Sequence, residues 1–281
     1  MSASANPAVA SANPVVASAN PVVAIRVVDV HKHFGGIVVA EGINLELNAG
    51  EILGLIGPNG AGKTTLFNLI CGIHAPDRGE IWLRDQRLSR MPAYRRARLG
   101  IARTWQNIRL FPTLNVLDNL LMGPRSYPGE ALLAGIVGGS TRRANAEAAY
   151  ARAETILARI GLADARDKSP GELPFGQQKL VGLARTLMND GEVLLLDEPM
   201  AGVEGQAYET MKQVVRDEAA AGRAVCVVEH NVSFIRDLCT RAVFMFNGRI
   251  EQSGTVEELL ASDKLAELYF GGMSNPQAGS S

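Results

Sequence analysis

Gly57-Pro-Asn-Gly-Ala-Gly62-Lys63-Thr64 is the stretch that decides the fold of this 281-residue chain. It matches the pattern G-x-x-x-x-G-K-[ST], follows the apolar run Glu51–Ile56 and opens a stretch of helical character that reaches about Ile73. In such a setting glycines let backbone N–H groups surround phosphates, and the helix N-terminus adds its positive end. The alternative is an ordinary glycine-rich turn, which the flanking strand and helix disfavour. The sequence therefore predicts a phosphate-binding loop.

Individual residues of this loop have distinct expected roles. Lys63 would neutralise the β- and γ-phosphates of a bound nucleotide, and the Thr64 hydroxyl would bind Mg²⁺. The residues expected to contact the nucleotide are Gly57, Pro58, Asn59, Gly60, Ala61, Gly62, Lys63, Thr64 and Thr65.

Two acids close a second apolar run. Val193–Leu196 is typical of a buried parallel strand, and Asp197 and Glu198 follow it directly. An acid there is costly unless a cation offsets it, so we expect Asp197 to hold Mg²⁺ through its water shell. Glu198, on the other face, would accept a proton from an attacking water. The alternative is a pair of acids that caps the strand and begins a helix.

His230 follows the next apolar run, Ala224–Val228, and lies near no other histidine in the sequence. A lone histidine is more often a structural hydrogen-bonding residue than a catalyst. Because ligands gather at the carboxyl ends of parallel strands, this position favours a catalytic role.

Composition bounds the class of protein. Hydrophobic residues make up 47% of the chain, enough for a sizeable core, and 28 Lys and Arg against 29 Asp and Glu disfavour nucleic acid as a partner. Three widely spaced cysteines indicate neither a disulfide framework nor a metal site, and idle thiols in a reducing cytosol are expected. Neither a membrane-spanning run nor a signal peptide is recognisable, so we expect another chain to hold the protein at any membrane.

The chain divides into a domain with a tail at each end. Residues 1–24 contain a seven-residue unit repeated three times, rich in small residues and proline, and this tail and residues 273–281 are expected to be disordered. Residues 25–272 mix strand patterns, such as Ile43–Leu47 and a hairpin turning at Asn247-Gly248, with a mostly helical stretch from about 107 to 190. The expected fold is a strand-rich α/β core interrupted by a helical insertion.

These pieces, in this order, resemble the ATP-binding subunit of ABC transporters over roughly residues 25–272. The deciding motif is Leu173-Pro-Phe-Gly-Gln-Gln178, which opens a helix and is similar to the family signature Leu-Ser-Gly-Gly-Gln. The resemblance implies an α/β P-loop ABC nucleotide-binding domain with an antiparallel β subdomain and an α-helical signature subdomain. It also implies ATP and Mg²⁺, and a pair of subunits in which Phe175, Gly176 and Gln177 face the γ-phosphate held by the partner.

Further motifs of the family occur at the expected places along the chain. Gln106 matches the Q-loop glutamine, which reaches the metal and reports the nucleotide state to the membrane partner, so it joins Glu198 and His230 as an expected catalytic residue. Phe34 matches the aromatic that stacks on adenine, and Ala201–Glu204 matches the D-loop that crosses the dimer interface. The alternatives are a surface amide for Gln106 and a packing aromatic for Phe34.

Within the family, Gly100–Pro112, the Gly-Gln-Gln signature ending and Leu268–Gly271 resemble the branched-chain amino acid importers, although amide and urea importers share these features. The resemblance implies a peripheral protein at the cytoplasmic face of the inner (plasma) membrane. Its implied partners are a second copy or a related ATPase, transmembrane permease subunits and, indirectly, a periplasmic solute-binding protein.

Three residues depart from the family pattern. Pro174 replaces the signature serine and removes one γ-phosphate donor, Phe175 replaces the next glycine, and Glu204 replaces the usual Asp or Asn of the D-loop.

Seven arginines crowd one stretch and are expected to form a solvated face, with acidic lipid headgroups or a membrane subunit as the alternative contact. They are Arg84, Arg87, Arg90, Arg95, Arg96, Arg98 and Arg103. The competing function is a soluble ABC ATPase that acts on DNA or ribosomes. Such proteins usually carry two cassettes or a long coiled-coil insertion, and this chain has one phosphate loop.

Overall fold

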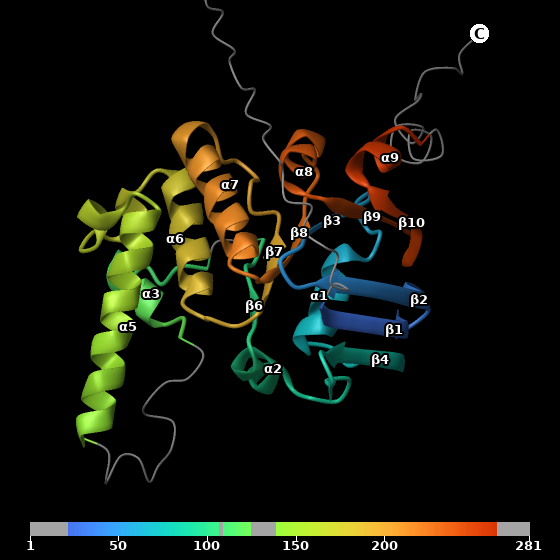
Figure 1. Cartoon of the computed structure of the whole chain (residues 1–281), viewed down its shortest axis with the longest axis horizontal. Helices are drawn as coiled ribbons and strands as arrows, with labels where there is room; N and C mark the ends of the chain where they lie inside the picture. Colours follow the sequence, from blue (N-terminus) through green and yellow to red (C-terminus); the bar gives the residue numbers. More distant parts are fainter. Residues whose placement is uncertain (1–21, 107–108, 125–138, 263–281) are drawn as a thin grey trace, which may run out of the picture.

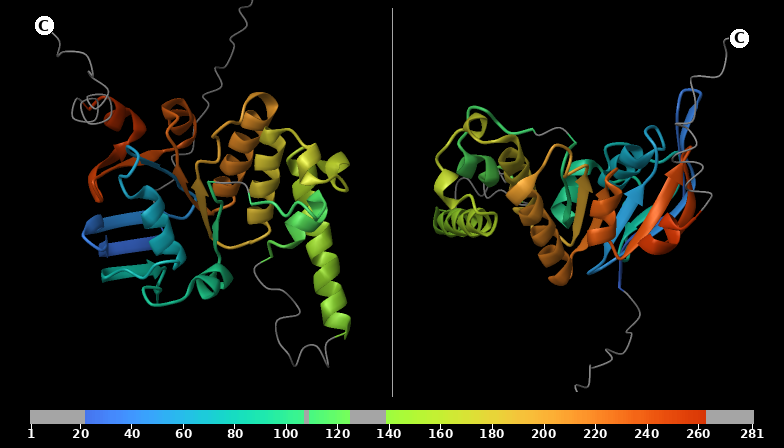
Figure 2. Two further views of the ribbon diagram at one scale, coloured as in Figure 1. Left: turned by 180° about the vertical axis from the view of Figure 1, so that it is seen from behind. Right: turned by 90° about the horizontal axis from the view of Figure 1, so that it is seen from above.

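The computed structural model describes residues 22–106, 109–124 and 139–262. Within them, helices α3, α5 and α6 gather at one end of the molecule and an antiparallel sheet lies at the other, as both figures show (Figure 1, Figure 2). The expected tails lie outside the described residues except at one boundary. Strand β1 begins at Val23, so the folded part starts two residues before the boundary expected at residue 25.

The larger sheet has the strand order β10-β9-β3-β8-β7-β6, and five neighbouring strands of it run parallel. Its members are β3 (Ile52–Ile56), β6 (Ile101–Arg103), β7 (Val193–Asp197), β8 (Ala224–Val228), β9 (Arg241–Phe246) and β10 (Arg249–Thr255). The last strand turns back on β9 through Asn247 and Gly248, both with positive φ, which confirms the expected hairpin.

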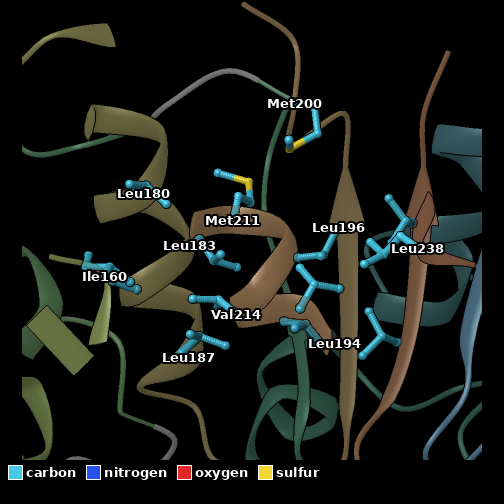
Figure 3. Packing of buried hydrophobic residues seen from close by; sticks show 14 of the residues in the cluster. Ile160, Leu180, Leu183, Leu187, Leu194, Leu196, Met200, Met211, Val214 and Leu238 are labelled. Atoms are coloured by element: carbon cyan, nitrogen blue, oxygen red, sulfur yellow. The ribbon is translucent and has the colours of Figure 1, made fainter. Parts of the chain in front are cut away.

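The sheet is buried on both faces because apolar residues alternate between two cores. Val193 and Leu195 of β7 pack in the cluster that contains helix α1 (Lys63–Cys71). Leu194 and Leu196 join the cluster that contains α7 (Gly205–Ala220), α8 (Val232–Leu238) and α9 (Val256–Leu260). Figure 3 shows this second core. The strands therefore sit at the centre of the protein, and their ends are the accessible parts.

The antiparallel sheet covers the outer side of α1 and confirms the expected β subdomain. Its strands are β1 (Val23–Phe34), β2 (Ile37–Asn48), β4 (Arg78–Leu83) and β5 (Gln86–Arg87), in the order β2-β1-β4-β5. The strand expected at Ile43–Leu47 is the second half of β2, and its residues Ile43, Leu45 and Leu47 pack in the same core as Phe67 of α1.

The described elements between residues 109 and 187 are helical. They are α3 (Val116–Leu121), α5 (Gly139–Arg159), the short turns η1 (Ala163–Ala165) and η2 (Pro170–Glu172), and α6 (Phe175–Leu187). The helix expected over residues 145–160 is α5, which begins earlier. Leu180, Leu183 and Leu187 of α6 face the core shared with the larger sheet (Figure 3), so the insertion is anchored through α6.

The expectation of a solvated arginine face is wrong for Arg96 and Arg103, both of which are largely buried. Arg96, on α2 (Ala93–Leu99), donates to the carbonyl oxygens of Leu69 (2.6 Å) and Ile70 (2.9 Å). Those carbonyls lie in the last turn of α1, where backbone partners run out; the Leu69 carbonyl also accepts the N–H of Gly72 (3.2 Å). The helix also stops at Cys71 rather than near residue 73, because Gly72 turns into the left-handed region.

Candidate active site

The loops that carry the expected functional residues meet at one edge of the larger sheet. Strands β3, β8, β7 and β6 are successive parallel neighbours, so their carboxyl ends point the same way. The phosphate loop follows β3, His230 follows β8, Asp197 and Glu198 end β7, and Gln106 follows β6. The topology therefore assembles one site from four segments that are distant in sequence.

The phosphate loop has a shape that excludes side chains at two of its glycines. A Cβ at Gly57 would lie 2.1 Å from the carbonyl oxygen of Met245, and one at Gly62 would lie 2.4 Å from that of Val39. Both glycines also have positive φ, 151° and 102°. Only glycine allows the loop backbone to pack this closely against the carbonyls of Met245 and Val39, so these two contacts fix the shape of the expected phosphate loop.

Lys63 lies at the centre of this loop. Its buried ammonium donates to the carbonyl oxygens of Gly57 (2.7 Å) and Pro58 (2.9 Å), and a third N–H remains for a ligand. Burial lowers the pKa of Lys63, whereas the nearby charges of Glu198 and Asp197 raise it. The lysine therefore lies between the loop and the acids, where its positive charge would stabilise an anionic ligand. Thr64, the next residue, is exposed at the start of α1.

The three residues expected to be catalytic come together at Glu198. Gln106 Nε2 donates to Glu198 Oε2 (2.8 Å), and His230 Nε2 lies 3.0 Å from Glu198 Oε1. Glu198 itself has a positive φ of 47°, a conformation that is costly for a residue with a side chain. Its N–H donates to the carbonyl of Val228 (2.9 Å), which holds this turn against β8. Both oxygens of one carboxylate are thereby oriented by two side chains from neighbouring strands.

Asp197 is buried and paired with Arg103. Arg103 Nη2 donates to Asp197 Oδ2 (2.7 Å), and Arg103 Nη1 donates to the side chain of Asn68 (2.6 Å). The Asp197 N–H donates to Thr104 Oγ1 (3.0 Å). A buried carboxylate needs such a partner, so the cation that the sequence implied for Asp197 is partly supplied by the chain. Arg103 was missed as a site residue because its partner lies 94 positions away.

The expected metal-binding residues Thr64, Gln106 and Asp197 offer a hydroxyl, an amide carbonyl and a carboxylate. These are the hard oxygen donors that Mg²⁺ prefers, and Gln106 keeps its carbonyl oxygen available because its amide nitrogen is used on Glu198. The described residues contain no cluster of three His, Cys, Asp or Glu suited to a dedicated cage. The three oxygen donors themselves fit Mg²⁺, which is usually held by few protein ligands together with waters and substrate phosphates.

The signature residues lie at the start of α6. Pro174 is the residue before the helix, and Phe175 is exposed with its ring against Gly202 of the D-loop, since a Cβ on Gly202 would lie 2.8 Å from it. Gly176 faces Ala207 closely, and Gln177 is partly buried. The structure thus places Phe175 in contact with the D-loop, an environment that the sequence did not indicate.

Phe34 lies apart from the Glu198 cluster. Its ring is exposed at the end of β1, with its centroid 5.0 Å from that of His74 and Lys32 Nζ 5.3 Å from the ring. The stacking role expected for Phe34 stays a prediction.

Glu229, which the sequence analysis did not single out, is buried beside the site. Its carboxylate accepts the N–H groups of Met200 (2.8 Å) and His230 (3.2 Å), which links the turn after β7 to the turn after β8. Burial raises the pKa of Glu229, although the backbone hydrogen bonds from Met200, His230 and Asn231 lower it. An acid at the end of the apolar run Ala224–Val228 was the available signal.

Comparisons with known proteins agree with the fold and show the family. A family model described as ABC transporter matches residues 40–201. The chain is 35% identical over 240 residues to the high-affinity branched-chain amino acid transport ATP-binding protein LivG of Escherichia coli K12, covering 85% of this chain and 94% of LivG. It is 36% identical over 245 residues to the L-cystine transport system ATP-binding protein TcyN of the same organism, covering 85% and 92%. The solved ADP conformation of MJ1267, an ATP-binding cassette of an ABC transporter, has a TM-score of 0.77 and 30% identity, covering 89% and 99%.

Proposed function

Because this chain belongs to the ABC transporter family, whose ATPases hydrolyse ATP to power transport, we propose that it is the motor subunit of an importer. The proposed cargo is a branched-chain amino acid or a related amino acid, amide or urea solute. The likeness to LivG supports amino acid cargo, while the similar identity to TcyN leaves the cargo class broad.

The single observation that carries a hydrolytic role is the arrangement of Glu198 between Gln106 and His230. A carboxylate held at both oxygens can accept a proton from a water that attacks the γ-phosphate. His230 then steadies the carboxylate and the charge that develops beside it. Gln106 links the same carboxylate to the loop after β6. A movement of that loop would therefore shift the base and the amide that faces the metal together.

Binding of ATP is assigned to the loop after β3. The backbone N–H groups of Gly57–Thr64, all but that of Pro58, which has none, would surround the phosphates, and Lys63 would place its charge beside them. Thr64, Asp197 and Gln106 would hold Mg²⁺, which when bound neutralises phosphate charge. Arg103 keeps the Asp197 carboxylate oriented through its 2.7 Å hydrogen bond. Phe34 would stack on the adenine from the end of β1.

Members of this family act as dimers and join transmembrane components. We assign Phe175, Gly176 and Gln177, at the start of α6, to the nucleotide held by a partner subunit, whether a second copy or a related ATPase. Exposure of Phe175 and of the neighbouring D-loop residues Ala201 and Gly202 supports this surface as the interface. Pro174 removes one hydrogen-bond donor from this surface. Closure of the dimer on the γ-phosphate is therefore stabilised by one contact fewer.

The membrane subunit has a suitable docking place beside Gln106. A groove of about 360 Å³ lies between β6, α3 and α6, with Trp105, Phe111 and Met122 exposed along it and Arg109 and Arg185 among its lining. None of the described helices is long and apolar enough to cross a membrane. We therefore propose a peripheral position at the cytoplasmic face of the inner membrane, held by permease subunits that insert a segment here.

The experiment is affinity purification of the tagged full-length chain from membranes, followed by solute uptake in vesicles that contain the copurified subunits. Import of labelled leucine, isoleucine or valine that requires ATP, and that urea and amides compete with only weakly, would support the amino acid assignment. Recovery without any membrane subunit, together with ATP turnover stimulated by DNA or ribosomes, would contradict the transport role.

A further inference from the structure

Lys179 is a buried lysine in the first turns of α6, four residues after the signature residue Phe175. Its ammonium donates to two backbone carbonyl oxygens, that of Glu198 at 3.2 Å and that of Gln106 at 3.3 Å. The signature helix of the insertion is thereby joined to two of the three loops that carry the expected catalytic side chains, those of Glu198 and Gln106.

The contact is expensive in electrostatic terms. In the part of the chain that the structure describes, Lys179 has no carboxylate within ion-pair distance, and carbonyl oxygens offset the loss of water only in part. Burial accordingly lowers the pKa of Lys179, while the more distant charges of Glu229, Glu198 and Asp197 raise it. Among the described residues, the ammonium meets these two carbonyls and the ring of Phe175, whose centroid lies 5.9 Å away.

Those carbonyls belong to two residues whose side chains are also hydrogen-bonded to each other. Gln106 Nε2 and Glu198 Oε2 are 2.8 Å apart, so Lys179 holds the main chain of the same two residues whose side chains form this bond. Glu198 also holds a left-handed conformation, with φ of 47°. Such strain persists only where the surroundings impose it, and Lys179 is bonded to the carbonyl of this strained residue.

We infer that Lys179 is a positioning residue that sets the backbone of Glu198 and Gln106 according to the placement of α6. The inference rests on the proposed function, because it assigns Glu198 as the base. When the signature at the start of α6 engages a partner's nucleotide, the ammonium a turn further along transmits that placement to the base of its own chain. The signature would then control hydrolysis in its own subunit as well as contact the ATP of the other.

The test compares ATP affinity, kcat, KM and the urea unfolding midpoint of the full-length wild-type chain with three variants. Lys179→Met removes the donors, Lys179→Arg retains charge and donors, and Lys212→Met is the matched control, since Lys212 is equally buried but paired with Glu209 and Asp237 on α7 and α8. We expect Lys179→Met to lower kcat about 10- to 100-fold with ATP affinity within about twofold, since a misplaced base costs rate rather than binding. Lys179→Arg should recover most of the rate, and Lys212→Met should leave it unchanged.

Turnover of Lys179→Met within about twofold of wild type would overturn the inference alone. So would a loss of rate that follows a loss of stability and that Lys179→Arg does not restore, because that pattern marks a structural role. If Lys179→Met does not fold, Lys179→Gln, which removes the charge and shortens the side chain by one bond, takes its place under the same criteria. Absence of turnover in the wild-type chain would instead overturn the proposed function, and this inference with it.

Discussion

His230 Nε2 lies 3.0 Å from Glu198 Oε1, and the two residues stand on loops that end the adjacent strands β8 and β7. The contact orients one oxygen of the carboxylate while Gln106 orients the other. A base fixed in this way loses little entropy when a water is placed before it. The predictions below test this arrangement and the loop and ion pair that support it.

Changing Glu198 to Gln should preserve ATP binding and abolish turnover, with a fall of at least about 100-fold, because the amide cannot accept the proton of the attacking water. The shape is nearly unchanged and one oxygen still accepts a hydrogen bond. We therefore expect the variant to accumulate as an ATP-bound closed dimer, measurable by size-exclusion chromatography with and without ATP. Undiminished hydrolysis would remove Glu198 as the base.

Changing Lys63 to Ala should weaken ATP binding by about 10- to 100-fold, since charge-assisted hydrogen bonds contribute about 1.5–3 kcal/mol. Isothermal titration with ATP measures the change. Lys168→Ala, at an exposed position of the insertion, is the control and should bind normally. Equal affinity for the Lys63 and Lys168 variants would overturn the phosphate-loop assignment.

Changing Gly62 to Ala should disturb the loop more than changing Gly60 to Ala. Both residues have positive φ, but a Cβ meets the carbonyl of Val39 at 2.4 Å only at Gly62, while at Gly60 it meets nothing within 4 Å. We expect a loss of at least about 2 kcal/mol in unfolding free energy for Gly62→Ala against about 1 kcal/mol for Gly60→Ala. Urea denaturation measures both, and equal losses would show that φ alone decides the cost.

Changing Arg103 to Met should cost about 3–5 kcal/mol in unfolding free energy, because it leaves the buried Asp197 carboxylate without its partner. Arg84→Met is the matched control from the same arginine-rich stretch. Its ion pair with Glu192 is half exposed, so its loss should cost no more than about 1 kcal/mol. Chemical denaturation of the two variants distinguishes them; similar losses would contradict the buried pairing.

Glu229 predicts a pH dependence of stability. Since burial raises its pKa above the ordinary 4.5, the folded state favours the protonated form. Its contribution is fully present below pH 4.5 and is lost as pH rises through the raised pKa. The unfolding free energy of wild type minus that of Glu229→Gln should therefore fall as pH increases above 4.5. Urea titrations of both proteins across that range provide the measurement, and a constant or rising difference would refute it.

Local patterns were enough to predict the elements that carry the chemistry. The phosphate loop, the strand before Asp197 and the hairpin at Asn247-Gly248 each depend on a few adjacent residues, and the structure contains the corresponding elements. The topology follows from parallel strands and explains why Gln106 and His230 meet Glu198. Each of these predictions depends either on residues that are close in sequence or on a general rule for how parallel strands are connected.

The features that were missed depend on partners far along the chain. The buried Arg96 side chain donates to carbonyls 26 and 27 positions earlier, and the Arg103 side chain donates to an acid 94 positions later. No local pattern of charges reveals such distant partners. Glu229 ends the apolar run Ala224–Val228, whereas Lys179 follows two glutamines, so a charge next to apolar residues was an available signal for Glu229 alone. It indicates burial but not the partner, which only the packing of α6 and the turns after β7 and β8 defines.

The Arg103–Asp197 pair also constrains the order in which the protein can be made. The chain leaves the ribosome from its N-terminus, so the arginine emerges before the whole helical insertion and the aspartate after it, 94 residues later. At roughly 5–20 residues per second this interval lasts about 5–20 seconds, during which Arg103 lacks the charge that permits its burial. The nascent polypeptide therefore cannot close its catalytic edge around nucleotide until translation has passed β7, and chaperones have that window in which to bind it.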